Sequence, residues 1–159
     1  MVMLDLNDRD GQKVRQTISV NEQENIAAIF VSSKNYSATT LYDYRKNLIG
    51  IRTINSNVCC VLRMDRSQIP SIQDMLTLMD NAKNNNPSSD DEITYRVTLE
   101  QAANPVDVGM SVNLLCSNVD IYWAKMESPR DVRRFKLKKP SWLKKPKWSV
   151  VANIAIPFG

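Results

Sequence analysis

The first part of the chain alternates between short apolar runs and clusters of turn-forming residues. β-Branched and aromatic residues gather between breaks at residues 21–24, 33–37, 46–47 and 55–57. This alternation is typical of successive strands. The pattern predicts an antiparallel meander with strands over Lys13–Val20, Asn25–Ser32, Ala38–Arg45, Leu48–Ile54 and Val58–Met64.

Beyond this meander the apolar residues change to helical spacing. They recur at intervals of three or four between Ile69 and Met79, and Pro70 suits a first helical turn, so a helix is predicted over 70–82. A second helix is predicted over 106–117, after Pro105. Two further apolar runs predict strands at Ile93–Leu99 and Val119–Met126.

Length and composition favour one folded domain with a short appended segment. The chain has 159 residues, of which 43% are hydrophobic and only 4 are glycine. No apolar run in the sequence approaches the length of about 18 residues that a membrane-spanning helix needs. The opening residues contain neither a basic nor an apolar signal region, so a secreted form is expected to carry its signal sequence outside this chain.

The charges divide the chain into an acidic body and a basic tail. Residues 1–129 carry 12 Lys and Arg against 16 Asp and Glu, a net of −4, whereas the remaining 30 residues hold +8. Within the tail, Lys138–Trp142 and Lys144–Trp148 form a near repeat of a lysine pair beside an indole. This pattern suits a boundary between water and lipid.

The residue types argue against catalysis and against a cofactor or metal. Histidine is absent, which removes the usual general base and the commonest metal ligand, and the three cysteines lack the C-x-x-C spacing of a zinc site. We therefore expect no enzyme activity. The odd number of cysteines leaves either one disulfide and a spare thiol or three free thiols.

Three blocks in the middle of the chain resemble the BRICHOS domain family, which includes gastrokines, the lung surfactant protein C precursor and precursors of polychaete antimicrobial peptides. They are Thr40–Tyr44, Arg63–Ile72 and Gly109–Cys116, with Cys59 sixteen residues after Asp43. The resemblance covers about residues 17–126. It divides the chain into an N-terminal propiece (1–16), a BRICHOS domain (17–126), a linker (127–134) and a C-terminal peptide (135–159).

The resemblance implies the class α+β, with a five-stranded, mainly antiparallel sheet flanked by two helices and followed by the basic tail. It also implies passage through the secretory pathway, an extracellular location and a chaperone that acts on a β-prone segment of its own precursor. By position, the family's cysteines fall on Cys59 and Cys116, so a disulfide joins them and Cys60 is spare. Three reduced, buried thiols are the alternative. The family's aspartate falls on Asp43, expected to be a protonation-sensitive structural switch; a carboxylate held by backbone donors is the alternative.

Basic cleavage patterns precede the tail. Arg130 and Arg133 form R-x-x-R, and Arg133 with Arg134 forms a dibasic pair. Cleavage there would release Phe135–Gly159, 25 residues with six lysines and no acidic residue. Because lysines attract anionic lipid and indoles insert into it, we expect a secreted precursor of a membrane-active antimicrobial peptide. The predicted membrane-binding residues are Lys136, Lys138, Lys139, Trp142, Lys144, Lys145, Lys147 and Trp148.

The end of the tail predicts the partner of the domain. Val150–Ile156 is low in charge and β-prone, hence prone to aggregate, and we expect the domain to bind it through a sheet face or edge. Other expected partners are β-prone peptides, an anionic bacterial membrane, a processing protease and a second copy of the chain. Asn35 begins an N-glycosylation sequon in a predicted loop.

Three alternatives to this interpretation stay open. In the first alternative, residues 130–159 are not a released peptide but either a solvated basic tail or a strand that completes the fold. In the second, a gastrokine-like secreted protein acts as the intact chain. In the third, the Lys and Trp residues of the tail bind nucleic acid through charge and stacking, although nucleic acid is the less favoured partner.

Overall fold

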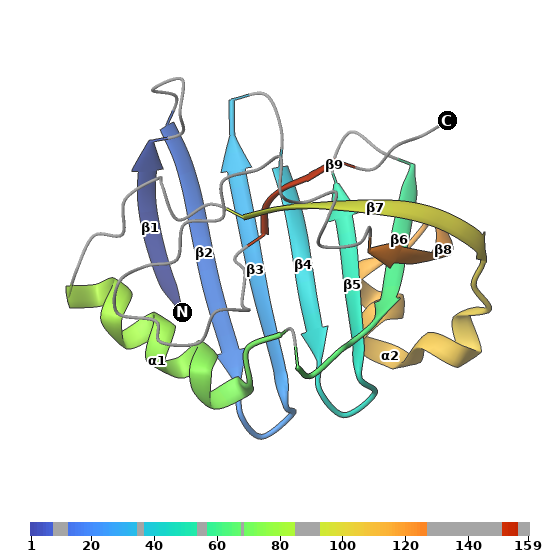
Figure 1. The fold of residues 1–159 in the computed structure, drawn as a ribbon, viewed down its shortest axis with the longest axis horizontal. Coiled ribbons are helices and arrows are strands. Elements are labelled where there is room, and N and C mark those ends of the chain that lie inside the picture. Colours follow the sequence, from blue (N-terminus) through green and yellow to red (C-terminus); the bar gives the residue numbers. More distant parts are fainter. Residues whose placement is uncertain are drawn as a thin grey trace.

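The computed structural model describes residues 1–7, 13–34, 37–53, 57–67, 69–84, 93–126 and 151–155 (Figure 1). This part of the chain forms nine strands and two helices. The strands form one mixed sheet, and one helix packs on each of its faces. The strands are β1 (Val2–Asn7), β2 (Lys13–Asn21), β3 (Ile26–Ser33), β4 (Ser37–Asp43), β5 (Leu48–Thr53), β6 (Val58–Arg63), β7 (Ile93–Ala102), β8 (Asp120–Met126) and β9 (Val151–Ala155); the helices are α1 (Ile72–Asn84) and α2 (Pro105–Leu115).

The sheet order is β1-β2-β3-β4-β5-β6-β8-β7-β9. Strands β1 to β6 form an antiparallel meander, β8 joins β6 in parallel, and β7 pairs antiparallel with β8 and parallel with β9. The class α+β and the mainly antiparallel sheet are thus confirmed. The expectation of five strands is wrong, because β1 and β9 extend the two ends of the sheet and the whole meander belongs to it.

Local chemistry explains where the predicted elements begin and end. Asn25 and Asn47 adopt positive φ angles of 54° and 55° in the turns before β3 and β5, a conformation that asparagine tolerates better than most residues. α1 begins two residues later than predicted, because Ser71 and Asp74 form a reciprocal capping box. β1 pairs with β2 from Val2 to Asn7, so the sheet continues across the boundary drawn at residue 17.

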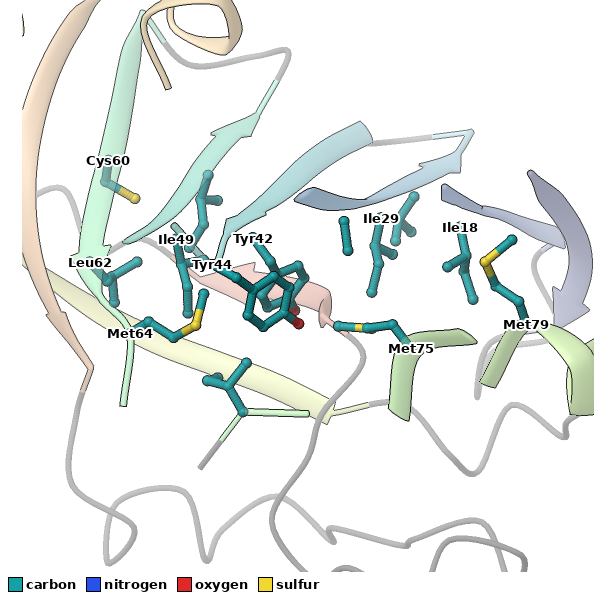
Figure 2. Packing of buried hydrophobic residues seen from close by; sticks show 14 of the residues in the cluster. Ile18, Ile29, Tyr42, Tyr44, Ile49, Cys60, Leu62, Met64, Met75 and Met79 are labelled. Atoms are coloured by element: carbon teal, nitrogen blue, oxygen red, sulfur yellow. The ribbon is translucent and has the colours of Figure 1, made fainter. Parts of the chain in front are cut away.

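Alternating side chains of the strands build two hydrophobic cores, one on each face of the sheet. The larger core includes Ile18, Ile29, Tyr42 and Ile49 and is closed by α1, which contributes Met75 and Met79 (Figure 2). The smaller core lies on the opposite face, where Val61 packs with Val108 and Val112 of α2. The pairing of β4 with β5 from Ala38 to Asp43 keeps the two sets in register.

The sheet curls over the larger core. In Figure 1, β7 crosses in front of β3, β4 and β5, while α2 lies behind the sheet. β9 contacts β3 and β4 as well as its partner β7. The curled end of the sheet therefore brings the strand from the tail against the middle of the domain.

Neither helix in the described residues is long and apolar enough to cross a membrane.

Candidate functional site

Helix α2 approaches the sheet closely because β5 has a glycine beneath it. A Cβ on Gly50 would lie 3.0 Å from Cδ2 of Leu115 and 3.5 Å from Cγ2 of Val112. Val112 is fully buried, and Leu115 packs against the same core. The absence of a side chain at Gly50 thus sets the distance between α2 and the sheet.

A disulfide fixes the C-terminal end of α2 to the sheet. It joins Cys59 of β6 to Cys116, with a Cα–Cα distance of 5.5 Å and a sequence separation of 57, so the bridge implied by the resemblance is confirmed. Cys60 is free and buried in the larger core on the opposite face (Figure 2). Burial raises the pKa of the Cys60 thiol to about 12, which keeps it protonated at neutral pH.

Two polar side chains complete the attachment and shape of α2. The guanidinium of Arg52 donates hydrogen bonds to the carbonyl oxygens of Leu115 at 2.8 Å and Ser117 at 3.1 Å, satisfying the helix end. Gly109 has φ 79° and ψ 175° inside α2, a region that essentially only glycine occupies. Gly109 thus forms a kink in the helix. Nδ2 of Asn113 donates hydrogen bonds to the carbonyl oxygens of Pro105 and Gly109, both at 2.7 Å, and so stabilises the backbone at the kink.

Asp43 lies at the end of β4 with 5% of its surface exposed. Its Oδ1 accepts a hydrogen bond of 3.1 Å from the backbone N–H of Lys46, which closes the turn to β5. The aliphatic chain of Lys46 then passes over Gly109 of α2, where a Cβ would lie 3.1 Å from Cε of the lysine. Asp43 therefore holds a turn that contacts α2, and its role as a protonation switch stays a prediction.

A second polar cluster holds the segment that leads into α1. The Tyr44 hydroxyl donates to the carbonyl oxygen of Pro70 at 2.7 Å, and burial raises the Tyr44 pKa above its ordinary value. Arg66 donates to the carbonyl oxygen of Tyr44 and, at 2.7 Å, to Oδ1 of Asn47. Its guanidinium also lies 5.1 Å from the centroid of the Tyr44 ring. These contacts fasten the start of α1 to the turn between β4 and β5.

The tail reaches the domain through its last strand. β9 pairs in parallel with β7, with Val151 opposite Ile93 and Ala155 opposite Arg96. Its five residues, Val-Ala-Asn-Ile-Ala, carry no charge. The candidate site is accordingly the β7 edge together with the part of the sheet that β9 contacts.

Several predicted site residues lie outside the described residues. They are the cleavage residues Arg130, Arg133 and Arg134, the glycosylation residue Asn35, and the membrane-binding residues Lys136, Lys138, Lys139, Trp142, Lys144, Lys145, Lys147 and Trp148. In the part of the chain that the structure describes, no group of three His, Cys, Asp or Glu residues is placed to hold a metal ion.

Sequence reasoning missed residues whose roles depend on contacts distant in sequence. Arg52 and the carbonyl of Leu115 are separated by 63 residues, and Tyr44 and Pro70 by 26. Nothing local marks these pairs. Two local signals were nevertheless present: the S-x-x-D capping box at Ser71, and a glycine inside a predicted helix at Gly109.

Comparison with known proteins defines the class. A family model of the BRICHOS domain matches residues 34–123, more than half of the chain, and the chain therefore belongs to the BRICHOS family. Among curated proteins, gastrokine-2 of Rattus norvegicus is 26% identical over 129 residues, covering 77% of this chain and 70% of the relative. Gastrokine-1 of Mus musculus is 24% identical over 127 residues, covering 77% and 69%. No solved structure matches the chain significantly.

Proposed function

We propose that this protein is a secreted BRICHOS chaperone precursor whose domain shields its own C-terminal segment, and that proteolysis releases the segment as a membrane-active antimicrobial peptide. The observation that carries the proposal is the parallel pairing of β9 with β7. β9 lies inside the predicted peptide 135–159, and it contacts β3 and β4 in addition to β7. The domain thus already has a strand of the predicted peptide as its neighbour.

This pairing offers a physical reason for a chaperone in the same chain. An uncharged, β-branched segment with free backbone groups pairs readily with copies of itself. Strand addition to β7 uses the N–H and C=O groups on one edge of Val151–Ala155. The position of β9 against β3 and β4 also restricts access from that side. Both effects lower the chance that two tails associate before release.

The charge distribution supports a second protective effect. Residues 1–129 carry a net charge of −4 and the remaining residues carry +8. An acidic domain reduces the attraction of a linked basic segment to anionic membranes, because the net charge of the intact chain is only +4. Separation would leave a peptide with six lysines and no acidic residue, which favours binding to anionic lipid.

Cleavage and release are separate steps in this mechanism. A cut after Arg134 leaves β9 held to the domain by non-covalent contacts alone, because β9 lies C-terminal to the cut. The effective concentration of the tail, of millimolar order while it is linked, then falls to the concentration of the free peptide. Cleavage thereby converts an intramolecular contact into a dissociable one.

The disulfide is compatible with the proposed location. Bridges such as Cys59–Cys116 form and persist in oxidising compartments, which include the secretory pathway and the extracellular space. Asp43, whose buried side chain closes the turn that contacts α2, is the residue predicted to be the switch. The Asp43→Asn chain should then lose any pH dependence of tail binding, and an unchanged pH profile would contradict this role.

The test compares the intact and cut chain on membranes. Purified full-length protein is treated with a protease that cuts after R-x-x-R or dibasic sites, and dye leakage is measured from phosphatidylglycerol vesicles and from phosphatidylcholine vesicles. We expect leakage only after cleavage and only from the anionic vesicles. The matched control is the Arg133→Gln/Arg134→Gln chain, which should not release residues 135–159 and should cause no leakage. Leakage by the intact chain would contradict shielding.

A second candidate function is favoured by the similarity to gastrokines, which extends over 77% of the chain. In this alternative the intact, secreted chain is the active form, and β9 is a permanent strand of the fold. Masses of the secreted protein from its native tissue distinguish the two. A peptide of residues 135–159 supports the precursor, as does a peptide of residues 135–158 with a C-terminal amide derived from Gly159. The intact chain alone supports the gastrokine-like protein.

A further inference from the structure

Strand β7 has different neighbours on its two edges. β8 pairs with one edge between Val97 and Ala102, where Val97 lies opposite Met126 and Ala102 opposite Tyr122. β9 pairs with the other edge, but only between Ile93 and Arg96. The ten-residue strand is thus covered along one part by β8 and along the other part by β9.

The outer edge of β7 continues beyond the contact with β9. From Val97 to Ala102, this edge has no strand partner among the described residues. Because β9 runs parallel to β7, its pairing along this edge ends with Ala155 opposite Arg96. A longer extended peptide in the place of β9 has more of the β7 backbone to pair with than the five residues of β9 use.

The surroundings of this edge select for low charge. β9 contacts β3 and β4, and the side chains of these strands that belong to the larger core, among them Ile29, Val31 and Tyr42, are buried. Figure 2 shows Ile29 and Tyr42 pointing from the sheet to the side on which Met75 of α1 lies. An ionised side chain placed against these buried apolar residues would lose hydration.

We propose that the outer edge of β7 is a receiving site for extended, uncharged, β-branched peptides that add in parallel, and that β9 inhibits this site by occupying it within the same chain. This inference rests on the proposed function, since both treat residues 151–155 as a client of the domain. It adds that the intact chain is a poor chaperone for other peptides. Departure of the tail then creates a domain that binds them.

The magnitude follows from the linkage between domain and tail. A tethered strand competes with a free peptide at an effective concentration of millimolar order. A free peptide of similar sequence at micromolar concentration is outcompeted while β9 is bound. Loss of β9 from the edge should therefore strengthen binding of a free peptide on the order of tenfold or more.

The test uses two neighbouring prolines in β9 of the full chain. Successive N–H groups of a strand point to opposite edges, so of Asn153 and Ile154 only one directs its N–H to β7. Proline removes that donor. We expect one of the variants Asn153→Pro and Ile154→Pro to expose the edge, while the other acts as its matched control.

The measurement is fluorescence polarisation of a labelled synthetic peptide with the sequence of residues 150–156. We expect one proline variant to bind it at least about tenfold more tightly than the unchanged chain, and the other to bind it like the unchanged chain. A probe carrying the change Ile154→Lys should bind neither. Thermal unfolding and the Cys59–Cys116 bridge verify that both variants are folded.

The outcomes are decisive. Equal binding by all three chains overturns inhibition by β9, and equal strengthening in both proline variants overturns pairing along one specific edge. Binding of the lysine probe overturns selection for low charge. These outcomes are independent of the proposed precursor, which fails instead if cleavage after Arg134 produces no vesicle leakage.

Discussion

Removal of the Cys59–Cys116 bridge is the perturbation whose size follows most directly from the structure. The double variant Cys59→Ala/Cys116→Ala deletes a cross-link between β6 and the end of α2. Both cysteines are buried, at 0% and 3% exposure. The substitution therefore frees the unfolded chain and also removes two sulfur atoms from the smaller core.

The sequence separation of 57 residues sets the entropic part. On the chain-entropy relation, a closed loop of this size restricts the unfolded state by about 4 kcal/mol at 25 °C. Since domains of this size are stable by about 5–15 kcal/mol, the double variant should lose a large fraction of its free energy of unfolding.

The neighbouring thiol supplies the control. Cys60 lies in the other core and is free, so Cys60→Ala removes a buried group of similar size without opening the bridge. We expect it to lose only about 1 kcal/mol. In addition, a reductant should destabilise the unchanged chain and the Cys60→Ala chain by about 4 kcal/mol, and should leave the double variant unaffected.

The assay is urea unfolding followed by tryptophan fluorescence, with and without reductant, together with thiol counting in denaturant. The unchanged chain should show one free thiol. A double variant within about 1 kcal/mol of the unchanged chain would refute the entropic argument. A Cys60–Cys116 bridge in the single variant Cys59→Ala would refute the assignment of Cys59 and Cys60 to opposite faces of β6.

Three further predictions concern single positions. Gly109→Ala should lower the free energy of unfolding by about 1–3 kcal/mol, because φ 79° with ψ 175° is strained for alanine; unchanged urea unfolding would contradict this. Gln16→Met should raise it by about 1–3 kcal/mol, because Nε2 of the buried Gln16 has no hydrogen-bond partner among the described residues; a less stable variant would contradict this. Burial raises the Cys60 pKa from 9.0 to about 12, so the unfolded chain loses its proton first and stability should fall as pH rises from 9 to 12. Urea unfolding at each pH should show a smaller fall in Cys60→Ala, since Tyr44, whose pKa is also raised, is present in both chains. Equal dependence of stability on pH in the two chains would contradict the assignment of the fall to Cys60.

The meander could be predicted because its signals are local. Each strand from β2 to β6 is short, β-branched and bounded by residues that favour turns, and the predicted bounds differ from the observed ones by a few residues at most. The differences have local causes as well. Asn25 belongs to the turn and not to β3, since its φ is 54°. Ser71 caps α1 and is not itself part of the helix.

The order of the last strands could not be predicted in this way. β8 enters between β6 and β7, so the chain passes the sheet edge and returns. The parallel register of Val58 with Asp120 depends on contacts over 62 positions, which no local pattern encodes. The pairing of Cys59 with Cys116 likewise came from the resemblance, because three cysteines alone allowed several arrangements.

The tail shows why a single property of a segment is a poor guide to its place. Its charge predicts a solvated, membrane-seeking peptide, whereas its apolar end predicts a strand that completes the sheet. The last lysine of the tail is Lys147, and the strand begins at Val151. The two properties therefore occupy different parts of the tail and do not compete. β7 pairs with Val151–Ala155, beyond the last lysine in the sequence, so under the proposed function the same contact suits both storage and release.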